Sequence, residues 1–104
     1  MSSPADTPPS LPSLGPFVVE GEIDMASAPG LEAALTAHLQ ASSGDVVLDC
    51  AAMTFIDSSG IRVLVRVARL LDAVDRRLVV TNLQENCREV LVLTGFDAVI
   101  HLDE

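Results

Sequence analysis

The sequence predicts a single small α/β domain, with a mostly parallel sheet of four to five strands and about three to four helices. Short apolar strand patterns alternate with helical patterns along the chain, and this alternation favours parallel strands joined by helical crossovers. The chain has 104 residues, of which 49% are apolar and three are phenylalanine. Such a chain can form one core, built mainly from Val, Leu, Ile and Ala.

The expected elements follow one another in strict alternation. Strands are expected at 17–23, 45–50, 78–80 and 99–102, and helices at about 27–40, 58–72 and 84–93. The first helix is indicated by Leu31, Leu35 and Leu39, which recur at helical spacing. Gly95 follows the last helix, where a glycine is typical of a helix end.

The first sixteen residues differ in composition from the rest. They contain five of the six prolines and several serines, so residues 1–16 are predicted to form a disordered tail. The folded domain is predicted to span residues 17–104.

Charge and composition exclude several classes of function. The net charge is −9 and all six basic residues are arginines, which argues against binding to nucleic acid or to an anionic membrane. A partner with a basic contact patch fits better. Cys50 and Cys87 lack the spacing of metal or redox motifs and are expected to be buried, reduced thiols. No signal peptide, membrane span or Gly-rich phosphate loop is evident, so a soluble cytoplasmic protein without cofactor or metal is expected.

The segment 55–62 carries the strongest local signal. Asp57 is predicted to cap the second helix, which places Ser58 at the first helical position. Ile56 and Ile61 have the spacing of a hydrophobic staple across this cap. A helix N-terminus offers free N–H donors and partial positive charge, so it tolerates a phosphate on Ser58.

The same segment is one of four motifs that resemble the STAS domain of bacterial anti-sigma factor antagonists. In order, they are Gly21-Glu22-Ile23-Asp24 with Ala28-Pro29 and Leu31, then Val46-Val47-Leu48, Phe55-Ile56-Asp57-Ser58-Ser59-Gly60-Ile61, and Leu93-Thr94-Gly95-Phe96. The resemblance covers roughly residues 17–102. Domains of this type usually begin with an additional edge strand. Here the proline-rich segment occupies that place, so the strand is expected to be short, irregular or absent.

The resemblance also implies a mechanism. The phosphoacceptor of the family is the serine directly after the aspartate, which corresponds to Ser58; Ser59 is the second candidate and is expected to be structural. An anti-sigma factor that is also a serine kinase would phosphorylate it with ATP, and a metal-dependent phosphatase of the PPM type would remove the phosphate. The unmodified protein would bind the kinase and free the sigma factor, and the phosphoprotein would release the kinase.

Parallel strands end at one edge of a sheet, so the carboxylates after two strands can flank the serine. The expected partner-binding residues are Asp24, Asp57, Ser58, Ser59, Gly60, Arg62, Val63 and Val67. Taken without the resemblance, Asp24 and Asp57 would be interpreted as ordinary helix caps.

The second helix is apolar on more than one face. Ile61, Leu64, Val65 and Ala68 are expected to pack on the sheet, and Val63, Val67 and Leu70 form a third face. Two interpretations of the third face remain open: it packs against the first helix, or it is the exposed apolar centre of the partner interface. Arg62 lies where the family more often has a small residue, and two interpretations of it remain open. It either pairs with Asp57 or the kinase's nucleotide phosphates before phosphorylation and with a phosphate on Ser58 afterwards, or it is simply solvated.

Two other functions compete with this interpretation. A serine hydrolase would need a base near Ser58, but His38 and His101 are the only histidines and no nucleophile elbow is present, so an enzyme is not expected. The alternative is a STAS subunit that acts without phosphorylation in a lipid-transport or sensory assembly.

Deletion of residues 1–13 is expected to leave folding intact, because their prolines prevent regular strand pairing. The melting temperature measured by circular dichroism should fall by less than about 5 °C, which corresponds to roughly 1 kcal/mol for a domain of this size. A larger fall would show that the tail covers the sheet edge.

Overall fold

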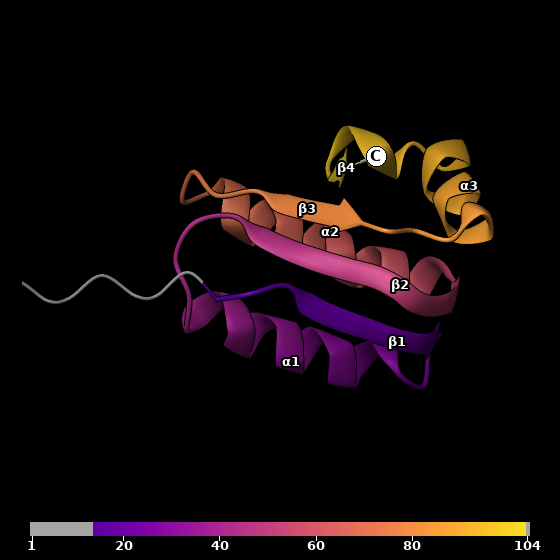
Figure 1. Cartoon of the computed structure of the whole chain (residues 1–104), viewed down its shortest axis with the longest axis horizontal. Coiled ribbons are helices and arrows are strands. Elements are labelled where there is room, and N and C mark those ends of the chain that lie inside the picture. Colours follow the sequence, from indigo (N-terminus) through magenta and orange to yellow (C-terminus); the bar gives the residue numbers. More distant parts are fainter. Residues whose placement is uncertain (1–13, 104) are drawn as a thin grey trace, which may run out of the picture.

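A computed structural model describes residues 14–103 of the chain (Figure 1). Within them, strands and helices alternate in the following order: β1 (Phe17–Ile23), α1 (Ala28–Gln40), β2 (Val46–Ile56), α2 (Ser58–Asp72), β3 (Leu78–Thr81), α3 (Glu85–Leu93), a short 3-10 helix η2 (Phe96–Ala98) and β4 (His101–Asp103). The four strands are all parallel and lie in the order β1-β2-β3-β4. The predicted α/β architecture is therefore confirmed, with four strands and three α-helices in the described part of the chain.

Most of the predicted tail, residues 1–13 of 1–16, lies outside the described residues. Residues 14–16 have no regular structure, and β1 is the edge strand of the sheet as far as the structure describes it. The disorder of the tail and the expected loss of a further edge strand therefore stay predictions.

Helices α1 and α2 lie side by side and form a layer against the sheet. In Figure 1, α1 runs along β1, and α2 lies behind β2 and β3. The core between these layers includes Leu35 of α1, Leu48 of β2 and Leu71 of α2, each with no exposed surface. The carboxyl ends of β1 and β2 lie at the right of Figure 1, where both helices begin.

Strand β2 is longer than expected, because its second half does not alternate. The register against β1 shifts between Val18↔Asp49 and Glu20↔Ala52, and again between Gly21↔Met53 and Glu22↔Phe55. Each shift places one extra residue in β2, as in a β-bulge. The buried side chains of β2 are accordingly spaced by two and then by three: Val46, Leu48, Cys50, Met53 and Ile56.

Helix α3 holds the second half of β2 after β3 has ended. Three side chains at or near its N-terminus donate to β2 carbonyl groups: Gln84 Nε2 to Ala51 (3.0 Å), Asn86 Nδ2 to Thr54 (3.0 Å) and Cys87 Sγ to Met53 (3.8 Å). These hydrogen bonds satisfy β2 carbonyl groups that would otherwise pair with a neighbouring strand. They also hold in place the end of β2 that leads into α2.

Both cysteines are free and buried, as expected. Burial raises the pKa of the Cys50 thiol to about 12, so it carries no thiolate at neutral pH.

Helix α2 is buried on two sides. Ile61, Leu64, Val65 and Ala68 are buried in the core, as predicted. Val63 and Val67 are also buried, with 3% and 0% of their surface exposed, on the helix that packs beside α1. The packing interpretation of this face is therefore favoured for Val63 and Val67, which present almost no surface. Their role in binding a partner stays a prediction. Leu70 alone of this third face is exposed.

The first turn of α2 lies directly on the ends of β1 and β2. Gly60 is buried there, and a β-carbon at this position would lie 2.6 Å from Ile23 Cγ2 and 2.7 Å from Ile56 Cγ1. The backbone of Gly60 thus closely approaches two core side chains. Gly60 is buried in this contact, and its role in binding a partner stays a prediction.

Replacement of Gly60 by alanine is expected to lower the free energy of unfolding by about 1–3 kcal/mol, the usual range for overpacking a core. Gly30 provides a matched control, because it lies in α1 and a β-carbon added there would have no neighbouring atom within 4 Å. Gly30→Ala should be neutral or stabilising by up to about 1 kcal/mol. Urea unfolding of both variants measures the difference, and equal stabilities would contradict the close-approach account.

Candidate functional site

The candidate site lies at the sheet edge where β1 and β2 end. The two strand ends are joined by a hydrogen bond from the Asp57 amide to the Ile23 carbonyl, 3.1 Å long. This bond brings the loop that begins at Asp24 next to the turn that contains Asp57 and Ser58. Strands β1 and β2 are neighbours in the sheet, which is the condition for the two carboxylates to flank Ser58.

Asp57 caps helix α2 as predicted. Its Oδ1 atom accepts hydrogen bonds from the amides of Ser59 (2.8 Å) and Gly60 (3.3 Å), and its backbone is extended. Ser58 is the first residue of the helix and is exposed. Its hydroxyl makes no hydrogen bond to any other residue in 14–103. A rigid backbone thus presents an unengaged hydroxyl to the solvent.

Asp24 organises the neighbouring loop rather than capping α1 directly. Its Oδ1 accepts from the amides of Ala26 (3.0 Å) and Ser27 (3.1 Å). The bond from the Ser27 amide is the main cause that holds the pKa of Asp24 below its ordinary value. The Ser27 hydroxyl in turn donates to the carbonyl of Glu22 (2.8 Å). Asp24 is therefore a fixed negative charge in the loop beside Ser58.

A groove of about 210 Å³ runs from this turn between α1 and α2. Its lining residues are Met25, Ala28, Pro29 and Glu32 from the first loop and α1, and Ser59, Arg62, Val63 and Arg66 from α2. Ser59 and Arg62 thus line the groove next to Ser58, and Met25, which is 79% exposed, stands at its rim.

The two arginines of the groove differ in their ion pairing. Arg66 forms an ion pair with Glu32 of α1, with 2.7 Å between Nη1 and Oε1. Arg62 is exposed and forms no ion pair or hydrogen bond with residues 14–103. No ion pair joins Arg62 to Asp57.

Met25 and Glu32 were missed from the sequence. Met25 is the one large apolar residue of the loop 24–27, directly after Asp24, and that contrast is a usable signal. Glu32 has no such signal, because its contact with Arg66 depends on how α1 lies against α2.

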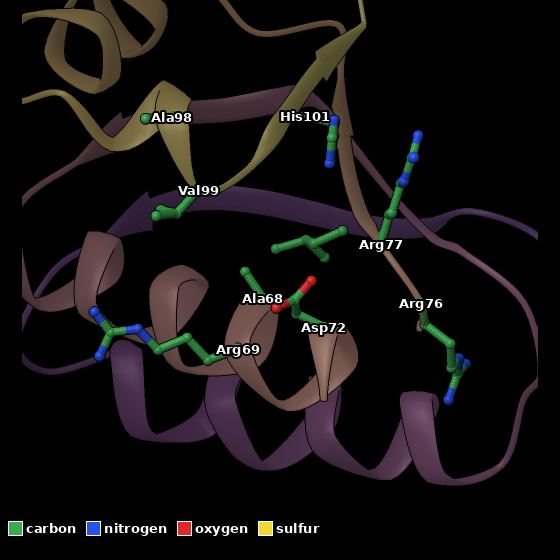
Figure 2. Close-up of a pocket in the computed structure, with 9 residues that line it drawn as sticks. Ala68, Arg69, Asp72, Arg76, Arg77, Ala98, Val99 and His101 are labelled. Atoms are coloured by element: carbon green, nitrogen blue, oxygen red, sulfur yellow. The ribbon is translucent and has the colours of Figure 1, made fainter. Parts of the chain in front are cut away.

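A larger hollow, of about 370 Å³, lies at the other end of α2, between its last turns and the segment from η2 to β4 (Figure 2). Its lining includes charged residues of both signs, Arg69, Asp72, Arg76 and Arg77, together with His101. The Asp72 carboxylate points into the hollow, whereas Arg76 turns away toward the carbonyls of Leu39 and Gly44. None of the predicted site residues lines it, and its mixed charge indicates no single class of ligand.

Metal-ligand clusters and membrane-spanning helices are absent from the described residues. In residues 14–103, no three His, Cys, Asp or Glu side chains are grouped so that they could hold a metal ion. No helix in this range is long and apolar enough to span a bilayer.

Comparison with known proteins identifies the family. The family model described as the STAS domain matches residues 9–104. The putative anti-sigma factor antagonist BtrV of Bordetella bronchiseptica is 37% identical over 78 residues, which are 75% of this chain and 67% of that protein. The anti-sigma-B factor antagonist of Staphylococcus epidermidis is 28% identical over 86 residues, which are 83% of this chain and 80% of that protein.

Solved structures agree with this result. The crystal structure of an anti-sigma factor antagonist from Mycobacterium paratuberculosis superimposes with a TM-score of 0.73 and 33% identity, over 82% of this chain and 72% of that one. The fold is also that of the unphosphorylated anti-sigma factor antagonist SpoIIAA, with a TM-score of 0.63 and 24% identity over 84% and 76% of the two chains. Anti-sigma factor antagonists are regulators rather than enzymes, as expected for this chain. With its four parallel strands, its capped Asp57-Ser58 turn and this match over nearly all of its length, the chain belongs to the STAS domain family of anti-sigma factor antagonists.

Proposed function

We propose that this chain is an anti-sigma factor antagonist that is switched by phosphorylation of Ser58. In the unmodified form it binds an anti-sigma factor that is also a serine kinase, and the sigma factor is released. Phosphorylation of Ser58 ends this binding. The observation that carries the proposal is the exposed, unengaged Ser58 hydroxyl at the start of α2, held in place by the Asp57 cap.

The chemistry is a phosphoryl transfer in which this chain is the substrate. The Ser58 oxygen attacks the γ-phosphorus of ATP held by the kinase, ADP leaves, and the hydroxyl proton passes to a base of the kinase. A metal-dependent phosphatase of the PPM type then adds water, which restores the hydroxyl and releases inorganic phosphate. Both reactions take place in the cytoplasm under this proposal.

The switch follows from charge. A phosphate adds about −1.5 to −2 charges at neutral pH, next to the carboxylates of Asp24 and Asp57. The lowered pKa of Asp24 keeps that carboxylate ionised, so the added charge is not relieved by proton uptake. A partner surface that fits the unmodified turn then meets excess negative charge and added bulk.

The fold does not need to change for this switch to work. The first turn of a helix tolerates a phosphate, because its free amides and partial positive charge favour anions. The neighbouring core contact of Gly60 with Ile23 and Ile56 is unaffected by a group that points into solvent.

Incubation with the cognate kinase and ATP is expected to add one phosphate to the chain, located at Ser58 by peptide mass spectrometry. Ser58→Ala serves as the control and should remain unmodified. Modification of Ser59 alone would refute the assignment. The absence of any modification would favour the alternative STAS subunit that acts without phosphorylation.

Ser58→Asp is expected to weaken binding to the anti-sigma kinase at least tenfold, about 1.4 kcal/mol, because it places a carboxylate where the phosphate would lie. Ser58→Ala and the neutral Ser58→Asn, which is nearly isosteric with the Asp variant, should bind the kinase more tightly than Ser58→Asp does. Calorimetric titration of the three variants provides the measurement. Equal affinities for the Asp and Asn variants would contradict a switch based on charge.

A further inference from the structure

We propose that Arg62 is a built-in receptor for the phosphate on Ser58, so that phosphorylation both adds charge and withdraws an unpaired arginine from the groove. The inference rests on the proposed phosphorylation of Ser58 and concerns what happens within the chain afterwards. It makes the groove between α1 and α2, and not only the serine, part of the switch.

The position of Arg62 on the helix suits this contact. Residues four apart on an α-helix lie on the same face, about 6 Å apart along the axis. Long side chains on a helix lean toward its N-terminus, which for Arg62 is the direction of Ser58. An arginine side chain readily spans one helical turn, and its planar guanidinium can bind two phosphate oxygens at once.

Arg62 is also the available cation at this site. Within the groove, Arg66 is already paired with Glu32 at 2.7 Å, whereas Arg62 has no partner among residues 14–103. The nearby carboxylates are engaged elsewhere: Asp57 accepts the amides of the first helical turn, and Asp24 accepts those of its own loop. A phosphate on Ser58 would therefore be the strongest free acceptor within reach of Arg62.

Two consequences follow for the groove. In the unmodified chain, Arg62 is free to meet a carboxylate of a partner at the wall of the groove, one turn from Ser58. Once it pairs with the phosphate, that contact is lost, and the groove retains only the arginine that is already neutralised by Glu32. The added phosphate and the loss of the free cation therefore both weaken the binding of an acidic group of the partner.

The contact can be tested without any kinase. Phosphoserine is installed at position 58 during translation, and the second pKa of the phosphate is followed by phosphorus NMR in the parent chain, Arg62→Gln and Arg69→Gln. A paired guanidinium stabilises the dianion and lowers this pKa. We expect Arg62→Gln to raise it by about 0.3–0.7 unit, the shift that corresponds to an exposed ion pair.

Arg69→Gln is the matched control. It removes the same charge from the same helix, from an exposed arginine that also has no partner among residues 14–103, but from a position about 16 Å along the axis from Ser58. Its phosphate pKa should equal that of the parent, and the Arg62 effect should shrink at high salt because exposed charges are screened.

Equal pKa values for the phosphate in Arg62→Gln and Arg69→Gln would overturn the proposal. Because the phosphoserine is installed during synthesis, this result does not depend on whether a kinase modifies Ser58. A kinase that leaves Ser58 unmodified would refute the proposed function, whereas unchanged titration curves would refute the role of Arg62 alone.

Discussion

The site depends on one close contact, that of the first turn of α2 with the ends of β1 and β2. At Gly60 the backbone lies so near Ile23 and Ile56 that a β-carbon would approach their side chains to 2.6 and 2.7 Å. The bond from the Asp57 amide to the Ile23 carbonyl ties the same two ends together. Ser58 lies between these two anchors in the chain. Its outward position is therefore set by core packing, and the hydroxyl is presented without any contribution from a mobile loop.

The packing that fixes the turn also decides what kind of surface surrounds it. Because α2 packs beside α1, Val63 and Val67 are buried, and the groove between the two helices is lined by both charged and apolar residues. Met25 is a large apolar residue exposed at the rim of this groove, beside the fixed charge of Asp24. Recognition at such a surface combines charged and apolar contacts, and its electrostatic part is sensitive to an added phosphate.

Local patterns in the sequence predicted the fold and the capped turn, because both depend on residues close together in the chain. The alternation of strands and helices, the Asp57 cap and the buried Ile61 face are confirmed by the structure. The features that the sequence left open or missed depend on contacts between residues that are far apart in the chain. The apolar spacing of Val63 and Val67 is the same whether α1 or a partner covers them. The second half of β2 was missed because its bulges break the alternation and its carbonyl groups are bonded by side chains at the start of α3, over thirty residues away.

The proposed switch depends on local charge rather than on the net charge of the chain. Exposed charges in the cell are screened beyond about 8 Å, so most of the net charge of −9 does not act at Ser58. The charges of the turn, its neighbouring loop and the groove are those of Asp24, Asp57, Glu32, Arg62 and Arg66, which nearly balance. Against such a background, the addition of about two negative charges is a large relative change. Arg62 is the unpaired cation of this set. It therefore determines how much of the added charge is neutralised within the chain and how much of it a partner meets.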